Sequence, residues 1–152
     1  MTIQGINFIK KYEGCILKAY KPVATEKYYT IGYGHYGSDV KADMVISQEE
    51  ADRLLVEDIK VFEYQLRLFM PATLQNNLKK HQWDMIVSFC FNLGVANFHK
   101  STLYKKMCAN LNDYDAIGKE WLKWCNAGGK RLEGLVRRRK EELEIFINGY
   151  KN

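Results

Sequence analysis

The strand-forming residues of this chain are confined to residues 15–40, and this confinement limits the possible folds more than any other feature. The runs CILKAY and YYTIGYGHY are rich in aromatic and β-branched residues, and KPVATEK between them has the composition of a turn. A polar loop follows over residues 37–43, and after Pro71 the periodicity is helical throughout. We therefore predict an α+β fold with a small antiparallel sheet lobe and a larger helical lobe.

Two helices flank the predicted sheet. Residues 3–12 carry isoleucines at helical spacing and predict a helix that ends just before Glu13. Ser47 and Glu50 have the spacing of a capping box, and apolar residues then recur every three or four positions until the next proline. This pattern predicts a connecting helix over about residues 47–69.

The remaining helices follow one another without a strand pattern. QWDMIVSFCFNL is apolar nearly all round, which is typical of a buried core helix, and Gly94 ends it. Ser101 can cap a shorter helix, and an amphipathic segment from Tyr114 to Trp124 stops at a glycine pair. The last run, GLVRRRKEELEIFI, interleaves arginine with glutamate for pairing four residues apart.

These segments predict one domain over residues 1–152, a length that can bury most of its apolar surface. The sheet lobe covers about residues 13–46, and the connecting helix covers about 47–69. The helical lobe covers about 70–152 together with the helix over 3–12.

The net charge is compatible with several kinds of partner and does not identify one. The net charge of +5 favours an envelope polymer, a membrane surface or nucleic acid, or it serves solubility alone. The basic residues are spread among acidic ones and no helix-turn-helix pattern appears, so we expect no nucleic-acid partner. The chain start lacks the pattern of a secretory signal, and no window approaches the ~18–20 apolar residues of a membrane-spanning helix. We therefore expect no stable membrane insertion.

The cysteines predict no metal site. All four, at positions 15, 90, 108 and 125, lack the CxxC spacing of zinc ligands. We expect reduced, packed thiols rather than disulfides, because a chain made in the cytosol keeps its cysteines reduced. The sequence predicts no cofactor either.

Three blocks of the chain, in the right order, resemble the phage-type lysozymes of glycoside hydrolase family 24. The first runs from Glu13-Gly14 through Ala19-Tyr20 to the hairpin TIGYGH. The second, SFCFNLGVANFHKSTLYKKM, is similar to the family's central helix and the turn after it. The third, WLKWCNAGGKRLEGLVRRRKEELEIF, is similar to the closing signature of its lambdoid branch. The resemblance covers most of the chain and implies a lysozyme-like domain.

The resemblance also implies an activity and a set of site residues. The activity is hydrolysis of the β-1,4 bond between N-acetylmuramic acid and N-acetylglucosamine in peptidoglycan, which lyses the host cell. Glu13 would be the general acid, and Thr30 would hold the attacking water. The residues implied near the saccharide are Tyr33, Gly34, His35, Phe91, Asn92 and Thr102. The arginine run at 137–139 belongs to the closing signature as scaffold.

The chemistry of glycosidic cleavage independently requires an acid such as Glu13. The leaving oxygen must receive a proton while an oxocarbenium-like centre forms. A carboxyl group at a helix C-terminus, next to Tyr12 and Ile16, has surroundings that disfavour its charged form. Without the motif, a helix-terminal glutamate in a surface ion pair is the better interpretation; with the motif, we favour the general acid.

The second acid of the family pattern is missing. The family carries it nine residues after the glutamate, where this chain has Pro22; counting backwards from Thr30 gives Ala24 instead. Glu26 in the same turn is one replacement, and as a base it would stand ~6.5–9.5 Å from Glu13. Alternatively, Thr30 and backbone groups position the water alone.

Two further functions stay open. A lytic transglycosylase needs only one glutamate, because the sugar's own hydroxyl closes the ring. A protein of this fold that lost its second acid could also bind the wall without cleaving it. We predict hydrolysis by a monomer that stays in the host cytoplasm until a separate membrane-permeabilising protein releases it to the wall. We expect His35 to pair with a nearby carboxylate.

Overall fold

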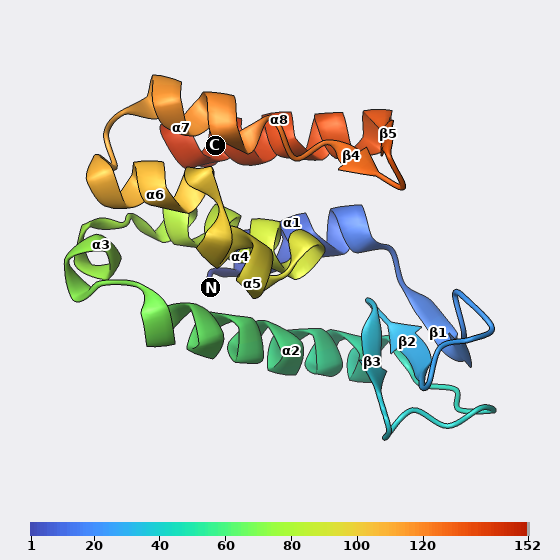
Figure 1. The fold of residues 1–152 in the computed structure, drawn as a ribbon. Helices are drawn as coiled ribbons and strands as arrows, with labels where there is room; N and C mark the ends of the chain where they lie inside the picture. The colour runs from blue at the N-terminus through green and yellow to red at the C-terminus, as the bar shows by residue number, and fades with distance from the viewer. Residues whose placement is uncertain (152) are drawn as a thin grey trace. The chain divides into compact units, whose positions relative to one another are not determined.

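The computed structural model describes residues 1–151, which divide into two compact units (Figure 1). The N-terminal unit is Ile6–Val61. The helical unit combines Met1–Gly5 with Phe62–Asn152. The mixed architecture, with a small antiparallel sheet and many helices, confirms the predicted α+β class.

The N-terminal unit contains the sheet. Its strands are β1 (Ile16–Tyr20), β2 (Tyr29–Gly32) and β3 (His35–Gly37), in the order β1-β2-β3 with antiparallel pairing. The helix α1 (Ile3–Glu13) leads into it, and α2 (Gln48–Phe69) leaves it. The central strand β2 is the one that the aromatic run predicted.

Strand β1 is irregular. Ile16 pairs with Gly32 and Tyr20 pairs with Thr30, so four steps along β1 match two steps along β2. The middle of β1 pairs instead with the segment before α2: the amide of Ala19 donates to the carbonyl of Met44 at 2.9 Å. A bulge of this kind bends a strand and increases its twist.

The predicted capping box begins α2. The Ser47 amide donates to the Glu50 carboxylate at 2.9 Å, and the Glu50 amide donates to Ser47 Oγ at 3.1 Å. These two bonds satisfy backbone donors that a helix start otherwise leaves unpaired. The helix therefore begins at Gln48, where the sequence predicts it.

The helical unit is built around α4 (Lys80–Leu93), whose residues 82–90 are all buried. Gly94, with φ at +91°, ends α4 as predicted. The elements around it are α3 (Ala72–Asn77), α5 (Val95–Lys100), α6 (Thr102–Ala109), α7 (Tyr114–Trp121) and α8 (Glu133–Asn148) (Figure 1). Ser101 caps α6, because its Oγ accepts from the Tyr104 amide at 3.0 Å.

A second hairpin corrects the prediction that everything after Pro71 is helical. The strands β4 (Asn126–Ala127) and β5 (Lys130–Arg131) pair in antiparallel fashion. Gly128 and Gly129 between them both have positive φ, +57° and +74°, which a two-residue hairpin turn with right-handed twist requires. The predicted segment up to Trp124 accordingly ends its helix at Trp121.

Candidate active site

Glu13 is the last residue of α1 and is half-buried. Gly14 follows with φ at +66°, a left-handed conformation that suits glycine after a helix end. A Cβ at Gly14 would meet no atom within 4 Å, so the backbone angle rather than crowding calls for glycine. Glu13 thus lies at the junction between α1 and β1.

Thr30 lies in the middle of the sheet. It is buried in β2 and stands opposite Tyr20 of β1 and Tyr36 of β3. Side chains of directly opposed residues share one face of an antiparallel sheet, so a tyrosine flanks Thr30 on each side. The Tyr36 hydroxyl also accepts a hydrogen bond from the Tyr28 amide at 3.3 Å.

Glu26 is half-buried in the connection between β1 and β2, and its amide donates to the carbonyl of Val23 at 3.0 Å. Pro22 and Ala24, the two positions where the resemblance places a second acid, are exposed. Between Glu13 and Thr30 the sequence contains no other carboxylate than Glu26. If a side chain of this segment replaces the missing acid, it is therefore Glu26.

Tyr33 and Gly34 form the turn between β2 and β3. The Tyr33 side chain is buried, and its hydroxyl accepts a hydrogen bond from Gln48 Nε2 at 2.9 Å. Burial raises the pKa of Tyr33 despite that bond. The Lys10 ammonium lies 5.7 Å from the Tyr33 ring centre and 2.8 Å from the Asp52 carboxylate. Tyr33 is therefore fixed from several sides, whereas Gly34 is exposed.

His35 is paired with carboxylates, as predicted. Its Nδ1 lies 2.9 Å from the Asp58 carboxylate on α2, and its Nε2 lies 2.9 Å from the Asp39 carboxylate. Burial lowers the pKa of His35, but the hydrogen bonds and negative charges of the two aspartates outweigh burial and raise it above 6.5. With both ring nitrogens engaged, His35 joins β3 to α2.

The pKa values of the two aspartates are shifted in opposite directions. The hydrogen bond with His35 lowers the pKa of Asp39 below 3.8. Burial raises the pKa of Asp58 above 3.8, although its hydrogen bond with His35 opposes that change. As pH falls, Asp58 is therefore the first of the two carboxylates to take up a proton.

The helical unit holds the other three predicted site residues. Phe91 of α4 is half-buried, with its ring centre 5.1 Å from that of Phe62. Asn92 is half-buried, and its Oδ1 accepts a hydrogen bond from Arg139 Nη2 at 3.0 Å. Thr102, the first residue of α6, is exposed. The structure thus places six predicted residues in the N-terminal unit and three in the helical unit.

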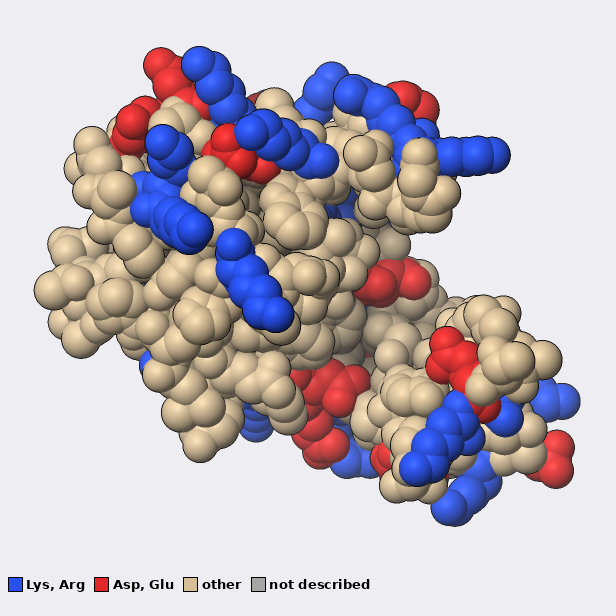
Figure 2. Space-filling view, in the orientation of Figure 1, with Lys and Arg blue, Asp and Glu red and all other residues tan. Residues whose placement is uncertain are grey.

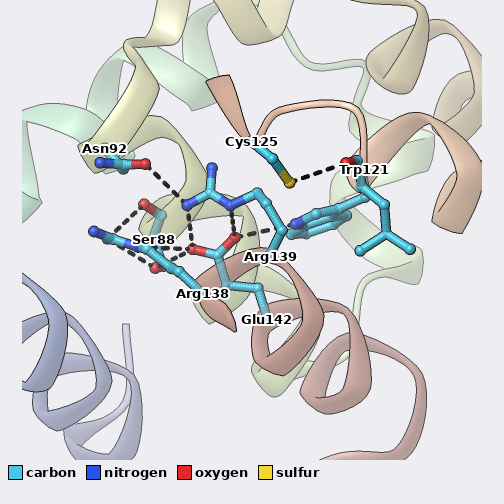
Figure 3. A network of polar contacts seen from close by, with 8 residues as sticks. Ser88, Asn92, Trp121, Cys125, Arg138, Arg139 and Glu142 are labelled. Carbon is cyan, nitrogen blue, oxygen red and sulfur yellow. Dashed lines mark hydrogen bonds and ion pairs between the residues drawn. The ribbon is translucent and has the colours of Figure 1, made fainter. Parts of the chain in front are cut away.

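A buried ionic network around Glu142 was missed by the sequence analysis (Figure 3). Glu142 is inaccessible to solvent. Its Oε1 accepts from Ser88 Oγ at 2.7 Å, and its Oε2 accepts from Trp121 Nε1 at 3.0 Å. Both Arg138 and Arg139 contact it, the first through Nε at 3.2 Å and the second through Nε at 2.9 Å.

A signal for this network was present in the sequence. Arg138, Arg139 and Glu142 recur at helical spacing with the apolar residues Leu135 and Phe146, so all five share one face of α8. The interleaved arginines and glutamates predicted pairing four residues apart, which the contact between Arg138 and Glu142 confirms. The burial of this pair was not predicted.

The positive charge is concentrated in the helical unit. That unit has 15 basic and 9 acidic residues, whereas the N-terminal unit has 8 basic and 9 acidic residues. Lysine and arginine side chains gather over α6, α7 and the β4–β5 hairpin (Figure 2). The attraction for an anionic polymer, inferred from the whole sequence, therefore belongs mainly to the helical unit.

Residues 1–151 contain no group of three or more histidine, cysteine, aspartate or glutamate side chains placed to hold a metal ion. All four cysteines are free thiols. None of the helices in this part of the chain has the length and apolar character needed to cross a bilayer.

Comparison with known proteins gives a consistent result. Residues 10–142 match the family model described as phage lysozyme. An endolysin of Bacillus phage B103 is 44% identical over 145 residues, which is 95% of this chain and 53% of that protein. An endolysin of Acyrthosiphon pisum secondary endosymbiont phage 1 is 39% identical and is covered over 94% of both chains.

Solved structures agree with the sequence matches. A crystal structure of a variant of P22 lysozyme is 30% identical, with a TM-score of 0.77 over 97% of this chain and 98% of that one. The chain spans about half the length of the Bacillus phage relatives that it matches.

Proposed function

Because this chain belongs to the phage lysozyme family, we propose that it is a peptidoglycan hydrolase that cleaves the β-1,4 bond between N-acetylmuramic acid and N-acetylglucosamine. One observation carries the proposal. Glu13 stands at the end of α1 and Thr30 in the central strand, within the residues that match the family. Both residues belong to one compact unit, in which β1 follows α1 along the chain and pairs with β2.

Glu13 is the general acid in the proposed reaction. It donates its proton to the glycosidic oxygen as positive charge develops at the anomeric carbon. The left-handed turn at Gly14 ends α1 at Glu13, three residues before the sheet begins at Ile16. Thr30 hydrogen-bonds the attacking water from its place in β2.

The second catalytic group is Glu26 or the Thr30 hydroxyl with nearby backbone. Among residues 1–151 the Glu26 carboxylate has no hydrogen bond or ion pair, so it is available as a base. If Glu26 is the base, Glu26→Gln loses more than about tenfold in rate, a cost above ~1.4 kcal/mol in the barrier. If Thr30 and the backbone suffice, the rate stays near normal while Thr30→Val lowers it.

A clearing assay on purified peptidoglycan tests Glu13. We expect Glu13→Gln to lower the initial rate by about 10²–10⁴-fold, the usual contribution of a general acid. Glu57→Gln, an exposed position paired with Arg53 in the same unit, is the matched control and keeps the wild-type rate. Equal clearing by the Glu13→Gln and wild-type proteins would remove Glu13 from the mechanism.

Product analysis distinguishes hydrolysis from transglycosylation. Transglycosylation is the alternative because the second acid is missing and that reaction needs only one glutamate. A reducing-end muramic acid is the expected product, and an anhydro sugar would show that the transglycosylase proposal is the correct one. If wild-type protein clears nothing but sediments with peptidoglycan, the protein is a wall-binding module instead.

The relatives' name of endolysin supports a proposal about where the protein acts. We infer that it is monomeric, stays in the host cytoplasm and reaches the wall when a separate protein permeabilises the membrane. Expression in a bacterial host with and without a membrane-permeabilising agent tests this. Lysis that begins without the agent would contradict the requirement for a second protein.

A further inference from the structure

A cavity of about 390 Å³ opens in the helical unit, apart from every predicted site residue. It lies where the chain start, the end of α2, α3 and the first turn of α4 come together. Its volume falls at the lower end of the ~300–1,000 Å³ range typical of small-molecule sites. The residues that matter for its chemistry are Met1, Arg67, Leu78, Lys80, Trp83 and Asp84.

The carboxylate that lines this cavity, Asp84, and the carboxylate of Glu63, which contacts the lining residues Met1 and Trp83, are already engaged. Asp84 is fully buried and accepts hydrogen bonds from the Thr2 amide at 2.8 Å, the Thr2 hydroxyl and the Tyr150 hydroxyl at 2.8 Å. Glu63 accepts from Trp83 Nε1 at 2.7 Å and pairs with the amino group of Met1. Because their oxygens are occupied by donors, these carboxylates offer little to a cationic ligand.

The basic side chains at the cavity are free to bind. The Arg67 guanidinium stacks on the Trp83 ring, 4.5 Å from its centre, and its only hydrogen bond within residues 1–151 is a long one of 3.5 Å to Gln75 Oε1. The Lys80 ammonium has no hydrogen bond or ion pair in the same part of the chain. A stacked guanidinium is pre-organised, so most of its N–H donors can bind an oxyanion without first losing another partner.

We propose that this cavity is a second ligand site that binds a small organic anion, with its carboxylate or phosphate group on Arg67 and Lys80 and its apolar body against Trp83, Leu78 and Met1. The apolar lining selects for an organic body, because a bare inorganic anion would leave it empty. The site shares no residue with the proposed hydrolase chemistry, so either proposal can fail without the other.

Phenyl phosphate is a suitable probe, because it combines a phosphate with a flat apolar body that the cavity can hold. Titration is followed through the indole N–H signals of the three tryptophans in a ¹H–¹⁵N spectrum, with Trp83→Phe to assign the relevant signal. We expect a saturable shift of the Trp83 signal. Benzyl alcohol, which lacks the charge, should give none, and inorganic phosphate should bind at least about tenfold more weakly.

Two variants and a matched control test the basic groups. Arg67→Gln and Lys80→Gln should each weaken phenyl phosphate binding by about tenfold or more, the usual effect of losing a hydrogen bond to a charged group. Arg53→Gln removes the same charge from the same helix, at a position paired with Glu57 and outside the cavity, and should bind as wild type does. Circular dichroism verifies that each variant is folded.

Several outcomes would overturn the proposal. They are the absence of a saturable Trp83 shift, equal weakening by Arg53→Gln, and binding of inorganic phosphate as tight as that of phenyl phosphate. If Arg67→Gln does not fold because it loses its stacking on Trp83, Lys80→Gln decides alone, and unchanged binding by that variant contradicts the site.

Discussion

Replacing Glu142 by glutamine tests whether the buried network stabilises the helical unit. Glu142 is surrounded by four donors from three helices, and two of these donors are the guanidinium groups of Arg138 and Arg139. Glutamine keeps the shape and one acceptor oxygen but removes the negative charge. Both arginines are nearly inaccessible to solvent, so they would lose the negative charge of Glu142 while they stay buried.

The expected cost is large relative to total stability. Removing one partner of a buried ion pair costs about 3–5 kcal/mol, because the remaining charge is uncompensated. A folded domain has a free energy of unfolding of only about 5–15 kcal/mol. For a chain of about this size each kcal/mol lowers the melting temperature by about 2–4 °C, so Glu142→Gln should lower it by about 6–20 °C.

Urea denaturation followed by tryptophan fluorescence measures this cost, with the midpoint and slope fitted for each variant. Glu144→Gln is the matched control, since Glu144 lies two residues away on α8 in an exposed pair with Lys151. Its midpoint should equal that of wild type, because exposed ion pairs add little. A Glu142→Gln protein within about 1 kcal/mol of wild type would refute the reasoning that the network holds α8 to α4.

Two further predictions concern other contacts. His35→Asn should cost about 1.5–3 kcal/mol near pH 5.5. This cost should shrink near pH 9. A histidine whose pKa is raised by folding stabilises the fold fully below pH 6.5, and this contribution is lost as pH rises through the folded-state pKa. A cost that does not change with pH in urea titrations would contradict this. Gly5→Ala places a Cβ 2.6 Å from the buried Asp84 carboxyl carbon and should cost about 1–3 kcal/mol. A Cβ at Gly134 would meet no atom within 4 Å, so Gly134→Ala should raise the free energy of unfolding by about 0.5–1 kcal/mol. Equal melting temperatures for these two alanine variants would show the crowding argument to be wrong.

The N-terminal unit could be predicted closely because its determinants are local. The isoleucine spacing and Gly14 set the end of α1, and the capping box at Ser47 sets the start of α2. The pairing of His35 with a carboxylate was also predictable in kind. Its two partners, Asp39 and Asp58, were not, because one of them comes from a helix 23 residues away in the sequence.

The helical unit was predicted less well because its determinants are distant from one another. The β4–β5 hairpin depends on two glycines that the sequence analysis took only as a helix stop. Arg138 meets Ser88, and Glu142 meets Trp121, both from other helices, and helical periodicity on α8 alone cannot reveal those partners. Alternation and spacing report which face a residue occupies, whereas the partner that meets that face is set by tertiary packing.

The network also links two of the sequence blocks that carry the family resemblance. Arg139 donates to Asn92, a predicted saccharide contact on α4, and the same guanidinium group contacts Glu142. Arg138 donates to Ser88, one turn earlier on α4. The orientation of the Asn92 amide therefore depends on a charge balance set within α8. The arginine run of the closing block is then scaffold in a specific sense, because Arg139 fixes the side chain of Asn92, a residue that the resemblance implies to lie near the saccharide.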